Sequence, residues 1–268
     1  MNIMSVAGFR RLGGVSALAL VMAATALPAV AERVSWGDPV AVGNGQARVA
    51  VSEQTDGIPS SVAVVLSAGV LEGLPVETPD QHEWEYLLPM PDDSPITGYR
   101  HVGLNWNPIG HIPEGIYSVP HFDVHFYLID AAEQQAITFQ GPDREARLIP
   151  PESTLVPAGY VIPPDSAVER MGVHGIDTDS EEFQGQPFTR TFVYGYDTGR
   201  LIFIEPMIAL DYLRSRPDAT LPVRTPAAYS SPGYYPGRYR VAYEPATDEY
   251  RVELLELRPF PAMPAKPL

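Results

Sequence analysis

The chain has 268 residues and carries 33 acidic against 18 basic residues, a formal net charge of −15, so its surface repels nucleic acid and anionic lipid. It contains no cysteine, which excludes a disulfide framework, thiolate metal ligands and thiol catalysis. Because 45% of its residues are hydrophobic, burial alone can stabilise a core.

The first 31 residues follow the pattern of a secretory signal peptide. Arg10 and Arg11 form a basic region, residues 13–27 are apolar or small, and Ala29-Val30-Ala31 supplies the small residues that signal peptidase reads. The apolar run is about 15 residues long, whereas a membrane span needs roughly 20. We therefore predict cleavage after residue 31 and a secreted or periplasmic protein with no membrane anchor. The general secretory route is favoured, and the arginine pair leaves the twin-arginine route open.

The rest of the chain has the composition of a β-protein. Its prolines and glycines, 29 and 22 in the full chain, argue against long helices, because an interior proline costs a helix about 3 kcal/mol. Short apolar runs between them predict strands over residues 47–51, 60–66, 99–106, 117–129, 189–196, 201–208, 239–243 and 250–257. Residues 197–199 and 245–248 are predicted hairpin turns, and only residues 131–137 look helical.

These elements predict a mainly β fold, a single antiparallel β-sandwich or barrel-like domain over residues 32–257 with one short helix. Residues 76–97 and 214–236 are predicted to be long proline-rich loops. Residues 258–268 hold four prolines and are predicted to be a loose tail.

Four of the six histidines fall between residues 101 and 125. In the predicted strand over residues 117–129, side chains alternate between two faces. Phe122, Val124, Phe126 and Leu128 share one apolar face, and the opposite face carries His121, Asp123, His125 and Tyr127. Two imidazoles around a carboxylate on so apolar a strand indicate a site that binds a metal ion.

Strand geometry limits how these side chains can share an ion. His121 and His125 lie about 13 Å apart along a straight strand, at roughly 3.3 Å per residue. Metal–nitrogen bonds are about 2.1 Å long, so one ion cannot easily reach both imidazoles. We therefore expect His121 with Asp123, or Asp123 with His125, to act as a pair, and the remaining ligands to come from other segments.

Three further residues are candidate ligands. His111 lies in a turn-rich loop that leads into the histidine strand, so it can fold back over that strand. His174 is flanked by Gly172 and Gly175 in a segment that permits close backbone approach. Glu205 ends an apolar run, where a carboxylate needs a partner. The predicted metal ligands are His111, His121, Asp123, His125, His174 and Glu205.

Imidazole and carboxylate ligands suit one divalent ion, with zinc preferred and copper, iron, nickel or manganese also compatible. A zinc ion with an open position lowers the pKa of bound water to about 7, and Glu205 or Glu114 is then a candidate base. Two other interpretations remain open at this point: a hydrogen-bonded structural network and a solvent-exposed polar row.

The segment over residues 107–129, NPIGHIPEGIYSVPHFDVHFYLI, resembles the signature of a family of secreted bacterial proteins of unknown function. Its PHFDVHFY block, residues 120–127, is the most specific part. The family includes a sigma-factor-controlled protein from Thermus. This resemblance implies export, a largely β subunit and assembly into a homo-oligomer, and it brings no activity.

Two hypotheses about function follow. The first is a secreted metal-binding protein, acting as a metal-dependent hydrolase or lyase on a substrate that the sequence does not identify. The second is a non-catalytic binding or structural homo-oligomer of the cell envelope.

Overall fold

The computed structural model describes residue 1 and residues 32–261. Residues 2–31 of the predicted signal peptide and the last seven residues of the predicted tail are outside the described residues. Among the described residues, no helix has the length and apolar content needed to span a membrane.

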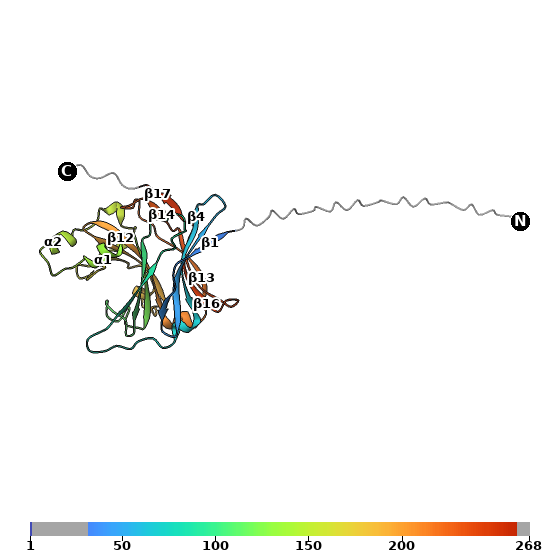
Figure 1. The fold of residues 1–268 in the computed structure, drawn as a ribbon, viewed down its shortest axis with the longest axis horizontal. Coiled ribbons are helices and arrows are strands. Elements are labelled where there is room, and N and C mark those ends of the chain that lie inside the picture. The colour runs from blue at the N-terminus through green and yellow to red at the C-terminus, as the bar shows by residue number, and fades with distance from the viewer. Residues whose placement is uncertain (2–31, 262–268) are drawn as a thin grey trace. The chain divides into compact units, whose positions relative to one another are not determined.

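The domain is mainly β, as predicted, and its strands form three antiparallel sheets. One sheet has seven strands, with the path β1-β3-β4-β16-β15-β13 and β2 beside β3. Its members are β1 (Arg33–Trp36), β2 (Val40–Val42), β3 (Gly45–Glu53), β4 (Pro59–Ser67), β13 (Asp218–Pro222), β15 (Arg238–Glu244) and β16 (Glu249–Leu255). Figure 1 shows its labelled strands β1, β4, β13 and β16 on one side of the domain and β12 on the other.

The eight-stranded sheet positions the candidate site. Its path is β5-β6-β7-β12-β11-β10-β8, with β9 beside β10. Its members are β5 (Trp84–Pro89), β6 (His101–Asn107), β7 (His121–Tyr127), β8 (Tyr160–Val161), β9 (Ala167–Val168), β10 (Gly172–Asp177), β11 (Arg190–Asp197) and β12 (Arg200–Ala209). The histidine-bearing strand β7 is an inner strand, paired with β6 on one side and β12 on the other.

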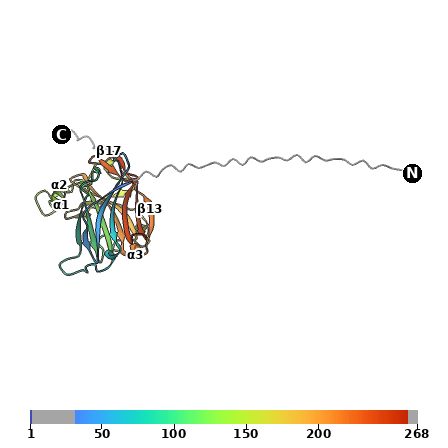
Figure 2. The same ribbon diagram turned by 45° about the vertical axis from the view of Figure 1, so that its right-hand side comes forward.

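A small third sheet pairs β14 (Gly233–Tyr235) with β17 (Arg258–Phe260). The helical elements are short: α1 (Ala131–Gln135), α2 (Arg144–Arg147) and α3 (Leu210–Arg214), with the 3-10 helices η1 (Ala68–Leu71), η2 (Ser153–Leu155) and η3 (Glu181–Gln184). Figure 2 shows α3 and β17 at opposite ends of the domain.

Both predicted hairpins are present, β11–β12 and β15–β16, and the predicted helix is α1. Three segments are more ordered than predicted. The predicted loop over residues 76–97 contains β5, and that over residues 214–236 contains β13 and β14. The first three residues of the predicted tail form β17. In each case, pairing with a neighbouring strand outweighs the local turn composition.

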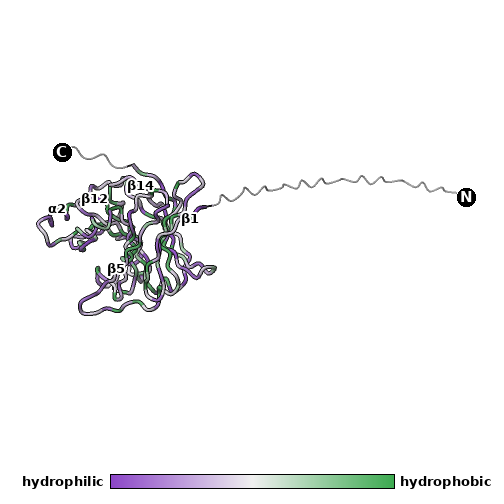
Figure 3. The backbone as a smooth tube through the Cα atoms, viewed as in Figure 1, coloured by the Kyte–Doolittle hydropathy of each residue, from purple (hydrophilic) through white to green (hydrophobic). Residues whose placement is uncertain are grey.

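The main core lies between the two large sheets. Val49 and Val64 of the seven-stranded sheet belong to the same buried cluster as Val124 and Ile204 of the eight-stranded sheet. Each fully buried aliphatic side chain contributes about 1.5–3 kcal/mol. Figure 3 shows hydrophobic segments along the strands and hydrophilic segments on the outer loops. The two sheets thus form the predicted sandwich.

The outer face of the eight-stranded sheet is also covered. Two smaller buried clusters lie there, one around Tyr127 and Phe203 and the other around Tyr117 and Met207. Strand β7 is therefore enclosed on both faces, and its seven residues are all buried. This second cover encloses the candidate site.

Candidate metal centre

The side chains of β7 alternate as the sequence predicts. Phe122, Val124 and Phe126 join the core between the sheets. His121 and His125 face the other way, together with Asp123, and these three residues are 0%, 1% and 3% exposed. A solvent-exposed polar row is therefore excluded, and three polar groups must be satisfied inside the protein.

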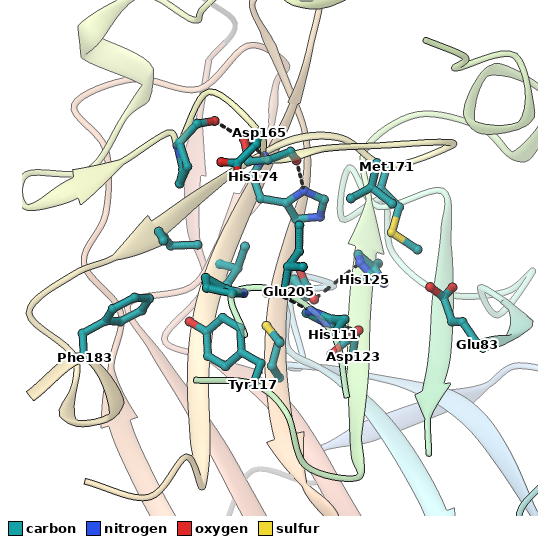
Figure 4. A pocket seen from close by; sticks show the side chains of 18 residues that line it. Glu83, His111, Tyr117, Asp123, His125, Asp165, Met171, His174, Phe183 and Glu205 are labelled. Atoms are coloured by element: carbon teal, nitrogen blue, oxygen red, sulfur yellow. Dashed lines mark hydrogen bonds and ion pairs between the residues drawn. The ribbon is translucent and has the colours of Figure 1, made fainter. Parts of the chain in front are cut away.

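The six predicted ligands form two separate groups that can each hold a metal ion. We call His111, His121 and Asp123 the loop triad, because His111 lies in the loop between β6 and β7. We call His125, His174 and Glu205 the strand triad, because they lie on β7, β10 and β12. Within each triad, the three donor atoms lie within 4.8 Å of one another. Figure 4 shows the strand triad together with His111 and Asp123 of the loop triad around one cavity.

The loop triad is centred on the carboxylate of Asp123. Its Oδ1 lies 3.1 Å from Nε2 of His121, and its Oδ2 lies 3.2 Å from Nε2 of His111. The amide of Asn107 donates a 2.7 Å hydrogen bond to the same Oδ2. Gly110 lets the loop fold back: its φ is +78°, and a Cβ there would lie 1.9 Å from the carbonyl oxygen of Tyr117.

The strand triad is built across three strands. Nε2 of His125 lies 3.5 Å from Oε1 of Glu205. His174 lies opposite Gly195 of β11, and a Cβ at Gly195 would lie 2.1 Å from the ring of Phe203. Because Gly195 has no side chain, the Phe203 ring can pack against the two imidazoles. Its ring centroid lies 4.7 Å from that of His125 and 5.4 Å from that of His174.

All four imidazoles are oriented in the same way. Nδ1 of each lies beside an oxygen that can only accept a hydrogen bond: Ile112 O for His111 (2.7 Å), Val119 O for His121 (2.7 Å), Asn105 Oδ1 for His125 (3.1 Å) and Ser166 O for His174 (3.0 Å). Each Nδ1 therefore carries a hydrogen and donates it. This leaves Nε2 of His121, His125 and His174 to coordinate a metal, as in histidine–metal sites whose outer partners fix the ring. Nε2 of His111 is also hydrogen-bonded to Asp123, so a metal ion must displace a proton from it.

Several donor atoms of the triads have no hydrogen-bond partner. They are Nε2 of His121, Oδ1 of Asp123, Nε2 of His125 and Oε2 of Glu205, all buried. A buried polar atom without a partner costs about 1–3 kcal/mol. A structural network would satisfy these atoms, whereas metal ligands keep them free. The set can therefore hold a metal ion.

Burial and charge act differently on the two triads. Burial lowers the pKa of His125 to about 3 and that of His174 to about 4. Burial also raises the pKa of Glu205 well above its usual value, and the charges of Asp123 and Glu83 add to this. Without an ion, the strand triad is therefore a set of neutral groups.

In the loop triad the Asp123 carboxylate dominates. Burial acts to lower the pKa of His111, but the charge and hydrogen bond of Asp123 outweigh it and raise the pKa to about 9. Burial likewise opposes ionisation of Asp123, yet His121 and His111 hold its pKa well below the usual value. Before any ion binds, this triad therefore already contains a charged carboxylate and a cationic partner.

A cavity of about 400 Å³ is lined by the whole strand triad and by His111 and Asp123 of the loop triad, whereas His121 is not among its lining residues. Glu83 also lines it, and burial raises the pKa of this carboxyl. Asn105 links Glu83 to the strand triad, because its amide donates to Glu83 while its oxygen accepts from His125. Glu114, a candidate base in the sequence, is exposed and is not among the residues that line the cavity.

Glu83, Asn105 and Asn107 escaped the sequence analysis. Strand register explains the position of the two asparagines: Asn105 of β6 pairs with Asp123 of β7, and Asn107 pairs with His121. Asn105 and Asn107 stand at alternate positions of a strand that is apolar apart from His101, and this is the signal that could have revealed these two residues. The two remaining histidines lie outside the triads, His82 beside Glu77 and His101 bonded to Gln134.

The chain was compared with protein-family models, curated protein sequences and solved structures, and none gave a significant match.

Proposed function

We propose that this chain is a secreted metal-dependent hydrolase or lyase whose ion is held by the strand triad. The observation that carries the proposal is the set of buried donor atoms without partners, Nε2 of His125 and Oε2 of Glu205. The separation of 3.5 Å between Nε2 of His125 and Oε1 of Glu205 is close to that of two ligands about 2.1 Å from one ion. Export follows from the secretory pattern in the sequence.

The chemistry of this donor set favours activation of water. Two neutral imidazoles and one carboxylate bind zinc in many hydrolytic sites and leave a position for water, whose pKa falls to about 7. Iron or manganese suits the same ligands. Glu83 is our candidate for the proton acceptor, because its buried carboxyl lines the same cavity and has a raised pKa, as a base near neutral pH requires.

The cavity wall favours a small and largely apolar substrate. Ile112, Tyr117, Met171, Ile176, Phe183 and Met207 contribute much of it. Among the described residues that line it, there is no arginine or lysine to pair with an anionic group, and Asp165 adds a further acid. We therefore favour an uncharged ester, lactone or hydratable carbonyl compound over a phosphate ester.

Elemental analysis of protein purified without an affinity tag tests the metal. We expect at least one zinc, iron, manganese or copper ion per chain, retained by the exposed-site control His82→Ala. Less than about 0.1 ion per chain, with no uptake on adding these metals, contradicts the proposal.

Turnover of small uncharged esters and lactones tests the chemistry. We expect His125→Ala and His174→Ala to abolish turnover while circular dichroism shows the β fold intact. Glu83→Gln should retain metal but lose activity by about 10²–10⁴-fold, the usual contribution of a general base. Metal binding without any turnover would favour the non-catalytic binding or structural homo-oligomer instead.

A further inference from the structure

The loop triad is a second set of three donor groups, and two of its members, His111 and Asp123, line the same cavity. We propose that His111, His121 and Asp123 bind a second divalent cation, which clamps the loop over residues 108–120 onto the eight-stranded sheet. The inference extends the proposed function and rests on it for the chemistry of the cavity, but none of its ligands belongs to the strand triad.

The contact between His121 and Asp123 requires a positive charge between the two groups, carried by a proton or by a metal ion. Nδ1 of His121 donates to the carbonyl oxygen of Val119, so in the neutral ring Nε2 carries a lone pair. That nitrogen lies 3.1 Å from Oδ1 of Asp123, yet both atoms are buried without a hydrogen-bond partner. In the neutral ring two electron pairs therefore face each other, and either a proton on Nε2 or a cation coordinated by both groups removes the repulsion.

The distances in the loop triad also fit an ion. Two ligands about 2.0–2.1 Å from a metal, at angles of 90–110°, are about 2.9–3.4 Å apart. Asp123 lies 3.1 Å from His121 and 3.2 Å from His111, measured between the donor atoms. Asn107 holds the carboxylate and Ile112 O holds His111, which are the outer partners that orient metal ligands.

A single ion shared by all six ligands conflicts with the strand spacing, which is roughly 3.3 Å per residue along β7. His121 and His125 are about 13 Å apart by the same measure. In Figure 4, His111 and Asp123 lie on one side of Glu205, and His174 lies on the other. Two ions with separate ligands therefore fit this arrangement better than a shared one.

The position of His111 indicates what the second ion does. It is the one loop-triad ligand outside the sheet, and its side chain is 35% exposed. Its neighbours Ile112 and Pro113 line the cavity, as does Tyr117 further along the same loop. A cation shared between His111 and β7 therefore fastens the loop wall of the cavity to the sheet.

Metal stoichiometry separates this inference from the proposed function. After equilibration with zinc and removal of free metal, we expect two ions per chain in the wild type and in His82→Ala. We expect one ion in His111→Ala and one in His174→Ala. Because His111 lies in a surface loop, the first variant should keep its near-ultraviolet circular dichroism.

Each other result has a definite meaning. A single ion that persists in His111→Ala and is lost in His174→Ala overturns the second site and leaves the proposed function standing. A single ion with the reverse pattern supports the loop triad and contradicts the proposed function. No ion in any variant overturns both.

Proteolysis gives a second measure of the clamp. Glu114 is exposed in the loop, so a glutamate-specific protease can cut there. We expect zinc to slow this cleavage at least about tenfold in the wild type and in His174→Ala, because binding stabilises the closed loop. His111→Ala should show no protection. Equal cleavage with and without zinc in the wild type would overturn the clamping role.

Discussion

The two triads contain the same chemical groups, two imidazoles and one carboxylate, but the chain builds them differently. Every residue of the strand triad lies on a strand, and His125 and Glu205 are almost fully buried. The loop triad takes two ligands from β7 and borrows His111 from a loop that is partly exposed. We infer that the strand triad is preformed, whereas the loop triad depends on the position of its loop.

The electrostatic difference has the same origin. Burial keeps Glu205 neutral and also lowers the pKa values of His125 and His174 to about 3 and 4, although the charge of Asp123 acts in the opposite direction on both imidazoles. Asp123 stays charged between its imidazoles, and it raises the pKa of His111 to about 9. The same residue types therefore respond to pH with opposite signs in the two triads.

The largest expected effect is acid destabilisation of the metal-free protein. For His125 and His174 the folded pKa lies below the unfolded value of about 6.5, so the unfolded chain binds more protons below that pH. Each of these two histidines should therefore lower the free energy of unfolding by up to about 1.4 kcal/mol per pH unit as the pH falls from about 6.5 towards 4. His111 has a raised pKa, and its smaller, solvent-screened contribution should be lost as pH rises towards 9.

Chemical denaturation in the presence of a chelator, repeated between pH 4.5 and 9, measures this. Other carboxylates also titrate in acid, so the informative quantity is the difference between the wild type and His174→Leu. We expect the variant to lose less stability between pH 6.5 and 4.5. Equal losses in the two proteins would show that His174 does not remain neutral in the fold.

The comparison of triads also shows what the sequence can predict. Alternation along β7 was enough to place His121, Asp123 and His125 on one face, because a strand exposes opposite faces at successive residues. The spacing of about 13 Å between His121 and His125 already argued against a shared ion. Both inferences are local, and they concern a strand whose second face is unusually polar.

The division into two triads was not accessible in this way. Glu205 joins His125 because β12 pairs with β7, and His174 joins them because β10 pairs with β11. These pairings depend on strand order, which the hydrophobic pattern leaves undetermined. β5, with the nearby Glu83, was missed for a related reason: a run rich in proline and acids looks like a loop until a neighbouring strand pairs with it.

The outer partners of the triads provide a finer test of the comparison. Asn105→Leu removes the oxygen that orients His125, and Asn107→Leu removes the amide that holds Asp123. Each change should weaken zinc binding about 10- to 100-fold at its own triad, the usual effect of losing such a partner. The other triad should keep its affinity.

Calorimetric titration with zinc separates the two sites when one triad is disabled. Asn105→Leu is measured in the His111→Ala background, where only the strand triad binds. Asn107→Leu is measured in the His174→Ala background, where only the loop triad binds. Unchanged affinity in both would mean that the outer asparagines do not orient the ligands. Equal weakening in the crossed backgrounds would mean that the two sites are one.

The smallest expected effect concerns the loop itself, and two glycines make a matched pair. Gly110 and Gly115 both have a φ of +78°, but a Cβ at Gly110 would lie 1.9 Å from Tyr117 O, whereas a Cβ at Gly115 meets nothing within 4 Å. Both alanine variants bear the cost of the left-handed backbone, about 1–2 kcal/mol. Only Gly110→Ala must also displace the turn that carries His111, so only this variant should lose zinc at the loop triad. If both variants keep the second ion, the loop tolerates the displacement, and His111 is not held in place by its turn. If both variants lose the second ion, backbone strain alone is enough to open the loop.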